Sequence, residues 1–150
     1  MALCRFFPSL ADYECECALY SRPKLAHVLP ALVQAVPNHD QTVRSRSGYA
    51  FPPFIVMDRG VTLHAWKETH RRFPAVLGMA LELAELLATL HEAGQVHRDL
   101  KPANVLLSMH TQEWRLLDLG SAATIGARIH PAGLACVYAD VLPHCQAARP

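Results

Sequence analysis

The residues that could carry out chemistry gather in two short stretches of this 150-residue chain. The first contains the carboxylate of Asp99, the ammonium of Lys101 and the amide of Asn104, and the second, fourteen residues beyond Asn104, contains Asp118. A carboxylate held in a loop can act as a general base or orient a hydroxyl nucleophile. An ammonium on the same side of that loop can neutralise a transferring phosphoryl group. Asn104 and Asp118 offer the oxygen ligands that Mg²⁺ prefers, so the pattern predicts phosphoryl transfer.

A long amphipathic helix is predicted just before these residues. Pro74 is a good first-turn residue and Gly94 a good terminal one. Between them, a polar stripe recurs at three- and four-residue spacing, and we expect the apolar side opposite it to face the core. The stripe contains Glu82, Glu85, Thr89 and Glu92, and the apolar side contains Leu77, Ala80, Leu81, Ala84, Leu87 and Ala88.

Short apolar runs predict the strands. Residues 105–107 and 114–117 predict a hairpin, which would bring the two magnesium ligands together although they are far apart in sequence. Residues 54–57 predict a buried strand, and residues 28–36 predict an edge strand that begins after Pro30.

The N-terminal part of the chain predicts further helical turns. Residues 9–22 predict a short helix, with Ser9 or Asp12 as its cap and Pro23 at its end. Thr62 can cap a second short helix. Two segments show no regular pattern, namely residues 37–50 and residues 121–150.

The composition is that of a chain with a packed core. Hydrophobic residues make up 51% and charged residues 18%. The net charge of +1 predicts neither nucleic acid nor a membrane surface as a partner. The five cysteines fit no zinc spacing, and we expect reduced thiols. Arg5 and Pro8 interrupt the first apolar run, so we expect no secretory signal there, and we expect no membrane span because no segment approaches ~18 apolar residues. We therefore expect a soluble, cytoplasmic chain.

Two motifs carry a resemblance to a known family. Residues 97–104, His-Arg-Asp-Leu-Lys-Pro-Ala-Asn, resemble the catalytic loop of eukaryotic-type serine/threonine protein kinases. Asp118, Leu119 and Gly120 are similar to the metal-binding Asp-Phe-Gly of that family, with leucine in place of phenylalanine. Aminoglycoside and choline kinases keep an aspartate and an asparagine at similar spacing but lack the Leu-Lys-Pro run, so protein kinases are favoured. Lys101 resembles the serine/threonine-kinase form, since tyrosine kinases usually place alanine or arginine nearby instead.

The resemblance implies a role for each residue of the two motifs. It implies that Asp99 is the base, that Lys101 contacts the γ-phosphate of ATP, and that Asn104 and Asp118 hold Mg²⁺. The implied acceptor is a serine or threonine hydroxyl of a protein. His97 and Leu119 are then packing residues, and Arg98 is expected to pair with a phosphorylated residue, with Ser121 or Thr124 as candidates.

The resemblance extends upstream to the segment that would contact the nucleotide base. Residues 54–60 resemble the last small-lobe strand and the hinge. Met57 would then be the gatekeeper, the backbone of Asp58 and Gly60 would face adenine, and Leu106 would lie under the base. Core packing is an equal alternative for Met57 and Leu106. The glutamate that pairs with the strand lysine of the family would be Glu14 or Glu16, which spacing does not decide.

The expected fold is α+β, a truncated protein-kinase-like domain over residues 12–139. It would contain a remnant of the small lobe plus the N-terminal half of the mainly helical large lobe, with residues 1–11 and 140–150 as irregular tails. Residues 135–139 resemble the approach to the Ala-Pro-Glu motif. No Gly-x-Gly-x-x-Gly occurs and the first lysine is Lys24, so we expect the phosphate-cradling loop and the strand lysine to be absent.

Three functional hypotheses follow. The first is transfer of the ATP γ-phosphate to protein serine or threonine hydroxyls. The second is a catalytically inactive, kinase-like fragment that acts as a binding module for another kinase or a scaffold. The third is an incomplete gene model of a full kinase. Loss of one electrostatic donor commonly costs ~10²–10³ in rate, so the missing phosphate contacts favour low activity for this chain alone.

Overall fold

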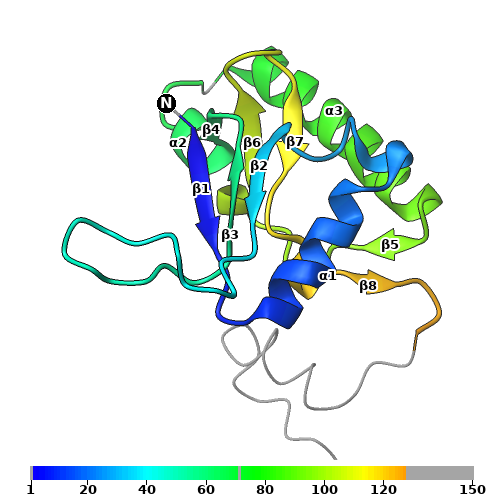
Figure 1. The fold of residues 1–150 in the computed structure, drawn as a ribbon. Coiled ribbons are helices and arrows are strands. Elements are labelled where there is room, and N and C mark those ends of the chain that lie inside the picture. Colours follow the sequence, from blue (N-terminus) through cyan, green and yellow to red (C-terminus); the bar gives the residue numbers. More distant parts are fainter. Residues whose placement is uncertain (1, 71, 128–150) are drawn as a thin grey trace, which may run out of the picture.

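The computed structural model of the chain describes residues 2–70 and 72–127. The predictions for residues 135–139 and 140–150 lie outside these described residues. The described part has a mixed α/β architecture, with two three-stranded sheets, a two-stranded ribbon and two long helices (Figure 1). The α+β expectation is therefore met at this level.

The first sheet contains β1 (Leu3–Phe6), β3 (Phe54–Met57) and β2 (Leu32–Val36), in the order β1-β3-β2 and with antiparallel pairing throughout. The predicted buried strand is thus the central one, and the segment after Pro30 forms an edge strand as expected. The prediction of an irregular tail over residues 1–11 is wrong for residues 3–6. These residues pair with β3, from Leu3 opposite Met57 to Phe6 opposite Phe54, and this long-range partner cannot be read from the local pattern.

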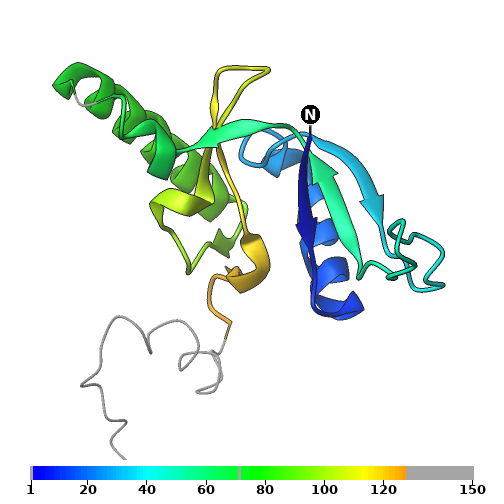
Figure 2. The same ribbon diagram turned by 90° about the vertical axis from the view of Figure 1, so that its left-hand side faces the viewer.

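Helix α1 (Leu10–Tyr20) packs on one face of this sheet (Figures 1 and 2). The side chain of Ser9 accepts a hydrogen bond from the backbone N–H of Asp12, so of the two predicted caps the structure selects Ser9. The helix ends before Pro23, which instead opens the 3₁₀ turn η1 (Pro23–Leu25). Tyr13 packs here with buried residues of the sheet side, namely Phe7, Ile55 and Met57. This packing orients α1 relative to the sheet.

The second sheet is built on the predicted hairpin. Strands β6 (Val105–Ser108) and β7 (Trp114–Leu116) are antiparallel, and β4 (Gly60–Thr62) pairs with the other edge of β6. Thr62 caps α2 (Leu63–Trp66) by accepting a hydrogen bond from the N–H of Ala65, as predicted. The indole of Trp66 packs edge-on against that of Trp114, with ring centroids 5.3 Å apart.

Helix α3 (Phe73–Glu92) is the predicted long helix, and Gly94 follows it with a φ of 77°. The predicted core-facing side is wrong for Leu77 and Leu81, which are 46% and 60% exposed, and is confirmed for Leu87, which packs against the core. The other residues through which the helix packs on the hairpin core were not on the predicted side, namely Ala75, Met79, Leu83, Leu86 and Leu90. Since α3 is apolar on more than one side, periodicity alone does not select the face that is buried.

By length and composition, α3 is the one helix within the described ranges that could cross a membrane, with a mean hydropathy of 1.6. The expectation that no segment approaches such a span is therefore wrong for this criterion. The helix carries Glu82, Glu85 and Glu92 and packs on β7, as core helices of soluble domains also do.

The loop over residues 97–104 lies among short elements. Strand β5 (Gln95–Val96) pairs with β8 (Ala123–Thr124), a strand that the sequence did not predict. The turn η2 (Pro102–Asn104) leads into β6, and η3 (Leu119–Ser121) follows β7. The pairing of β5 with β8 therefore brings the segment after Asp118 back beside the start of the loop.

Candidate active site

His97 connects the loop over residues 97–104 to the segment that leads to Asp118. Its ring is 2% exposed, and Nε2 donates to the carbonyl oxygen of Leu117 at 2.9 Å while Nδ1 accepts from the N–H of Asp99 at 3.3 Å. Leu119 is also buried, within the core cluster that includes Leu116. The structure thus places His97 and Leu119 in the packing roles that the sequence predicted.

Asp99 lies at the centre of a fixed polar trio. Its Oδ2 accepts from Nζ of Lys101 at 2.7 Å and from Nδ2 of Asn104 at 2.9 Å. The hydrogen bond from Lys101 is the main reason that the pKa of Asp99 is lowered, and the same contact raises the pKa of Lys101. The carboxylate is therefore ionised at neutral pH and oriented from two sides, and the side chain of Lys101 is about half exposed.

Asn104 and Asp118 lie on one small cavity of about 180 Å³, together with Met57 and Leu117. The amide of Asn104 donates from Nδ2 to both the backbone carbonyl and Oδ2 of Asp99, so its carbonyl oxygen remains as an acceptor. No group of three or more His, Cys, Asp or Glu side chains within residues 2–70 and 72–127 could hold a metal. Two oxygen ligands nevertheless suit Mg²⁺, which keeps several waters and shares substrate phosphates. The donor set therefore fits the implied ion.

Backbone strain accompanies the two motifs. Arg98 and Asp118 have φ values of 64° and 60°, in the left-handed region that non-glycine residues seldom adopt. Arg98 donates from Nε to the carbonyl oxygen of Ser121. Such strain is held by the surrounding structure and is commonly found at functional sites. The predicted pairing of Arg98 with a phosphorylated residue stays a prediction.

Arg5 is the site residue that the sequence analysis missed. From β1, its Nη2 approaches Oδ1 of Asp118 to 2.6 Å and Oε2 of Glu16 to 3.2 Å. No lysine precedes α1, as expected, but Arg5 of β1 supplies a cation that contacts both the helix glutamate Glu16 and Asp118. An arginine within an otherwise apolar run upstream of a helix was the available signal, but we interpreted it as an interruption of that run.

The structure also chooses between the two helix glutamates. Glu14 is exposed, whereas Glu16 is 2% exposed and faces Arg5. Burial raises the pKa of Glu16 to about 7; the nearby Arg5 opposes this rise and Asp118 adds to it. Desolvation therefore outweighs the ion pair, whose geometry leaves Oε2 of Glu16 and Nε of Arg5 without a hydrogen-bond partner among the described residues.

Gly120 completes the surroundings of Arg5. A Cβ added at this glycine would lie 3.1 Å from Nη2 of Arg5 and 3.4 Å from Oδ1 of Asp118. The ring of Phe7 lies on another side, with its centroid 5.2 Å from the guanidinium carbon. The guanidinium of Arg5 therefore has four neighbours: the carboxylates of Glu16 and Asp118, the ring of Phe7 and the backbone of Gly120.

The residues predicted to contact adenine do not all meet at this cavity. Met57 lines it, but Asp58, Gly60 and Leu106 are not among its lining residues. The N–H of Asp58 donates to the carbonyl oxygen of Ala31 at 3.0 Å, and Leu106 is 1% exposed, as in the core-packing alternative. Gly60 lies directly on Leu106, since an added Cβ would be 2.5 Å from Cγ of that leucine. Contact of these residues with a nucleotide stays a prediction.

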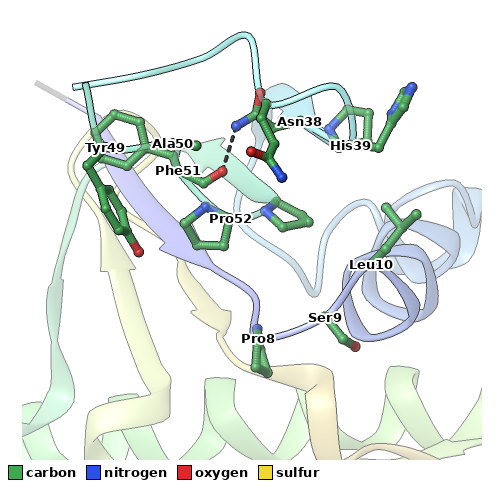
Figure 3. Close-up of a pocket in the computed structure, with 12 residues that line it drawn as sticks. Pro8, Ser9, Leu10, Asn38, His39, Tyr49, Ala50, Phe51 and Pro52 are labelled. Carbon is green, nitrogen blue, oxygen red and sulfur yellow. Dashed lines mark hydrogen bonds between the residues drawn. The ribbon is translucent and has the colours of Figure 1, made fainter. Parts of the chain in front are cut away.

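A larger cavity of about 480 Å³ lies away from the catalytic residues, between the start of α1 and the loop over residues 37–53 (Figure 3). Prolines and aromatic residues line much of it, including Pro8, Pro52 and Tyr49. Asn38 stabilises the loop through a hydrogen bond from Nδ2 to the carbonyl oxygen of Phe51. This cavity is larger than the one on Asn104 and Asp118, but the groups able to perform chemistry lie at the smaller one.

Comparison with known proteins gives consistent matches. The family model described as "Protein kinase domain" matches residues 57–137, more than half of the chain. A "Probable serine/threonine-protein kinase" of Streptomyces coelicolor is 37% identical over 78 residues, covering 49% of this chain and 11% of the relative. A "Dual serine/threonine and tyrosine protein kinase" of Strongylocentrotus purpuratus is 37% identical over 78 residues, covering 47% of this chain and 8% of the relative. The chain thus spans about a tenth of the length of these relatives.

Proposed function

The chain belongs to the protein kinase family. On this premise we propose that it carries the catalytic loop and the metal-binding residues of a serine/threonine kinase domain. The proposed reaction is transfer of the γ-phosphate of ATP to a serine or threonine hydroxyl of a protein. We place the first sheet and α1 in a small lobe, and the hairpin with α3 in the N-terminal half of a large lobe. The observation that carries the proposal is the trio of Asp99, Lys101 and Asn104 beside Asp118.

Each side chain has a defined task in this reaction. The ionised Asp99 accepts the proton of the substrate hydroxyl, whose oxygen forms the new bond to the γ-phosphorus as the bond to ADP breaks. Lys101 balances the charge on the transferring phosphoryl group. Asn104 and Asp118 would hold Mg²⁺, which supplies charge neutralisation on the phosphate oxygens when bound.

Transfer from labelled ATP tests this proposal. The purified chain is incubated with ATP, Mg²⁺ and a generic protein substrate, beside the variants Asp99→Ala and Asp40→Ala. We expect Asp99→Ala to lose ~10²–10⁴ in rate, the usual contribution of an acid–base group. Asp40 is exposed in the loop between β2 and β3 and serves as the matched carboxylate control. Labelling by the unaltered chain that is no higher than that of Asp99→Ala would exclude catalysis by this chain.

A binding module is the second candidate function, and α3 supplies the observation for it. Phe73, Leu77 and Leu81 are 75%, 46% and 60% exposed, at four-residue spacing along one side of the helix. Exposed apolar patches favour association. Binding to a complete kinase domain that Leu81→Glu abolishes would support this role, whereas a monodisperse monomer without such affinity would contradict it.

A further inference from the structure

The loop between β2 and β3 contains a hairpin that the proposed reaction does not use. The N–H of Phe51 donates to the carbonyl oxygen of Val43 at 3.1 Å, and the N–H of Ser45 donates to that of Tyr49 at 2.8 Å. This hairpin projects away from the first sheet (Figure 1). It also lies outside residues 57–137, which the family model matches. Any role of the hairpin must therefore follow from its own residues.

Asn38 fixes the base of the hairpin and is only 6% exposed. Its Nδ2 donates to the carbonyl oxygens of Val43 at 3.1 Å and Phe51 at 2.5 Å, and its Oδ1 accepts from the N–H of Val43 at 2.9 Å. The turn at the tip is closed by a hydrogen bond from the N–H of Gly48 to the carbonyl oxygen of Ser45 at 3.0 Å. Because exposed hydrogen bonds open locally at low cost, the tip can open while the base stays in place. An acceptor segment needs this freedom to enter the cleft of an enzyme.

Two serine hydroxyls lie at the tip, and they differ in their contacts. Ser47 is exposed, whereas Ser45 is half-buried. Oγ of Ser45 accepts a hydrogen bond from the N–H of Tyr49 at 3.1 Å and lies 2.8 Å from Oγ of Ser47. Among the described residues, this contact with Ser45 is the one hydrogen bond of the Ser47 side chain. Ser47 is therefore the hydroxyl that an enzyme can reach with the smaller rearrangement.

Two arginines give the tip a positive charge. Arg44 and Arg46 are exposed and lie three residues and one residue before Ser47, and residues 41–53 contain no aspartate or glutamate. Nη1 of Arg44 donates to the carbonyl oxygen of Gly48 at 2.9 Å, so the guanidinium lies beside the residue that follows Ser47. Guanidinium groups bind phosphate through parallel hydrogen bonds. A phosphate on Ser47 would thus lie next to a cation that is already in position.

We propose that Ser47 is a phosphorylation site of an arginine-directed serine kinase, and that Arg44 binds the resulting phosphate across the hairpin. In this step, Oγ of Ser47 forms a bond to the γ-phosphorus of ATP as the bond to ADP breaks, and the hydroxyl proton passes to the carboxylate base of that kinase. The positive charge of Arg44 and Arg46 complements an acidic peptide-binding groove. The product adds about two negative charges to the tip. The inference does not rest on the proposed function of this chain, because a separate kinase supplies the phosphate.

Labelling of the intact chain by a purified arginine-directed serine kinase and labelled ATP tests the assignment. A parallel reaction without that kinase measures labelling by the chain itself, so a failure of the proposed function leaves the result interpretable. Ser47→Ala and Ser45→Ala are compared with Ser21→Ala, since Ser21 is also exposed but has Ala18 three residues before it. Mass spectrometry after chymotryptic digestion locates the phosphate.

We expect labelling of Ser47→Ala to fall to the level of the reaction without added kinase. Ser45→Ala and Ser21→Ala should be labelled like the intact chain. Unchanged labelling of Ser47→Ala would overturn the assignment, as would phosphate on Ser45 of the intact chain. An intact chain that the added kinase does not label would overturn it as well.

A pH titration of the ³¹P resonance of the phosphorylated chain tests the role of Arg44. A neighbouring guanidinium favours the more highly charged form of the phosphate. The titration midpoint of the intact chain should therefore lie roughly 0.2–0.7 pH unit below that of Arg44→Gln, as expected for an exposed ion pair. Arg22→Gln alters another exposed arginine and should titrate like the intact chain. Equal midpoints for the intact chain and Arg44→Gln would overturn the binding of the phosphate by Arg44.

Discussion

Replacing Glu16 with glutamine should change how the stability of the fold depends on pH. In the folded chain, burial raises the pKa of Glu16 from 4.5 to about 7. The folded state therefore holds this proton more tightly than the unfolded state does. The resulting stabilisation is fully present below pH 4.5 and is lost as the pH rises through about 7.

The size of this loss follows from the difference between the two pKa values. At about 1.4 kcal/mol per pH unit, the difference corresponds to roughly 3 kcal/mol of unfolding free energy. Glutamine has a similar shape but does not titrate. The intact chain should thus lose roughly 3 kcal/mol relative to Glu16→Gln between pH 4 and pH 8.

Urea unfolding at several pH values measures this difference. Glu14→Gln is the matched control, because Glu14 lies on the same helix but is exposed. Its unfolding free energy should run parallel to that of the intact chain. If the curve of Glu16→Gln also ran parallel, the reasoning about buried Glu16 would be refuted.

The remaining predictions concern stability and are measured by the same unfolding assay. Gly60→Ala should destabilise by ~1–3 kcal/mol or more, because its Cβ would overlap the Leu107 carbonyl oxygen, whereas Gly78→Ala in open space on α3 should stabilise by ~0.5–1 kcal/mol. The opposite order would contradict the close approach at Gly60. Leu90→Ala should cost ~2–5 kcal/mol because Leu90 is 0% exposed, whereas Leu81→Ala should change stability by less than ~0.5 kcal/mol. Equal effects would contradict the assignment of the packed face of α3.

Local sequence was sufficient wherever the information is contained in neighbouring residues. The sequence predicted a cap at Ser9 or Asp12, a helix end before Pro23 and a hairpin that starts at Val105, because capping, the proline ring and turn residues act over a few neighbouring residues. The family motifs likewise identified Asp99 and its partners as one group, and the structure places them within hydrogen-bonding distance.

Only the tertiary structure decided which side of each element is used. Helical periodicity did not show that Glu16 rather than Glu14 faces inward, nor that Leu90 rather than Leu81 packs on the hairpin, because both choices depend on the partner surface. Arg5 is the clearest case. It lies 113 residues from Asp118 in sequence, and the pairing of β1 with β3 brings the two together. The residue types of the loop over residues 97–104 can thus be read from the sequence, whereas the contact between Arg5 and Asp118 exists only in the folded chain.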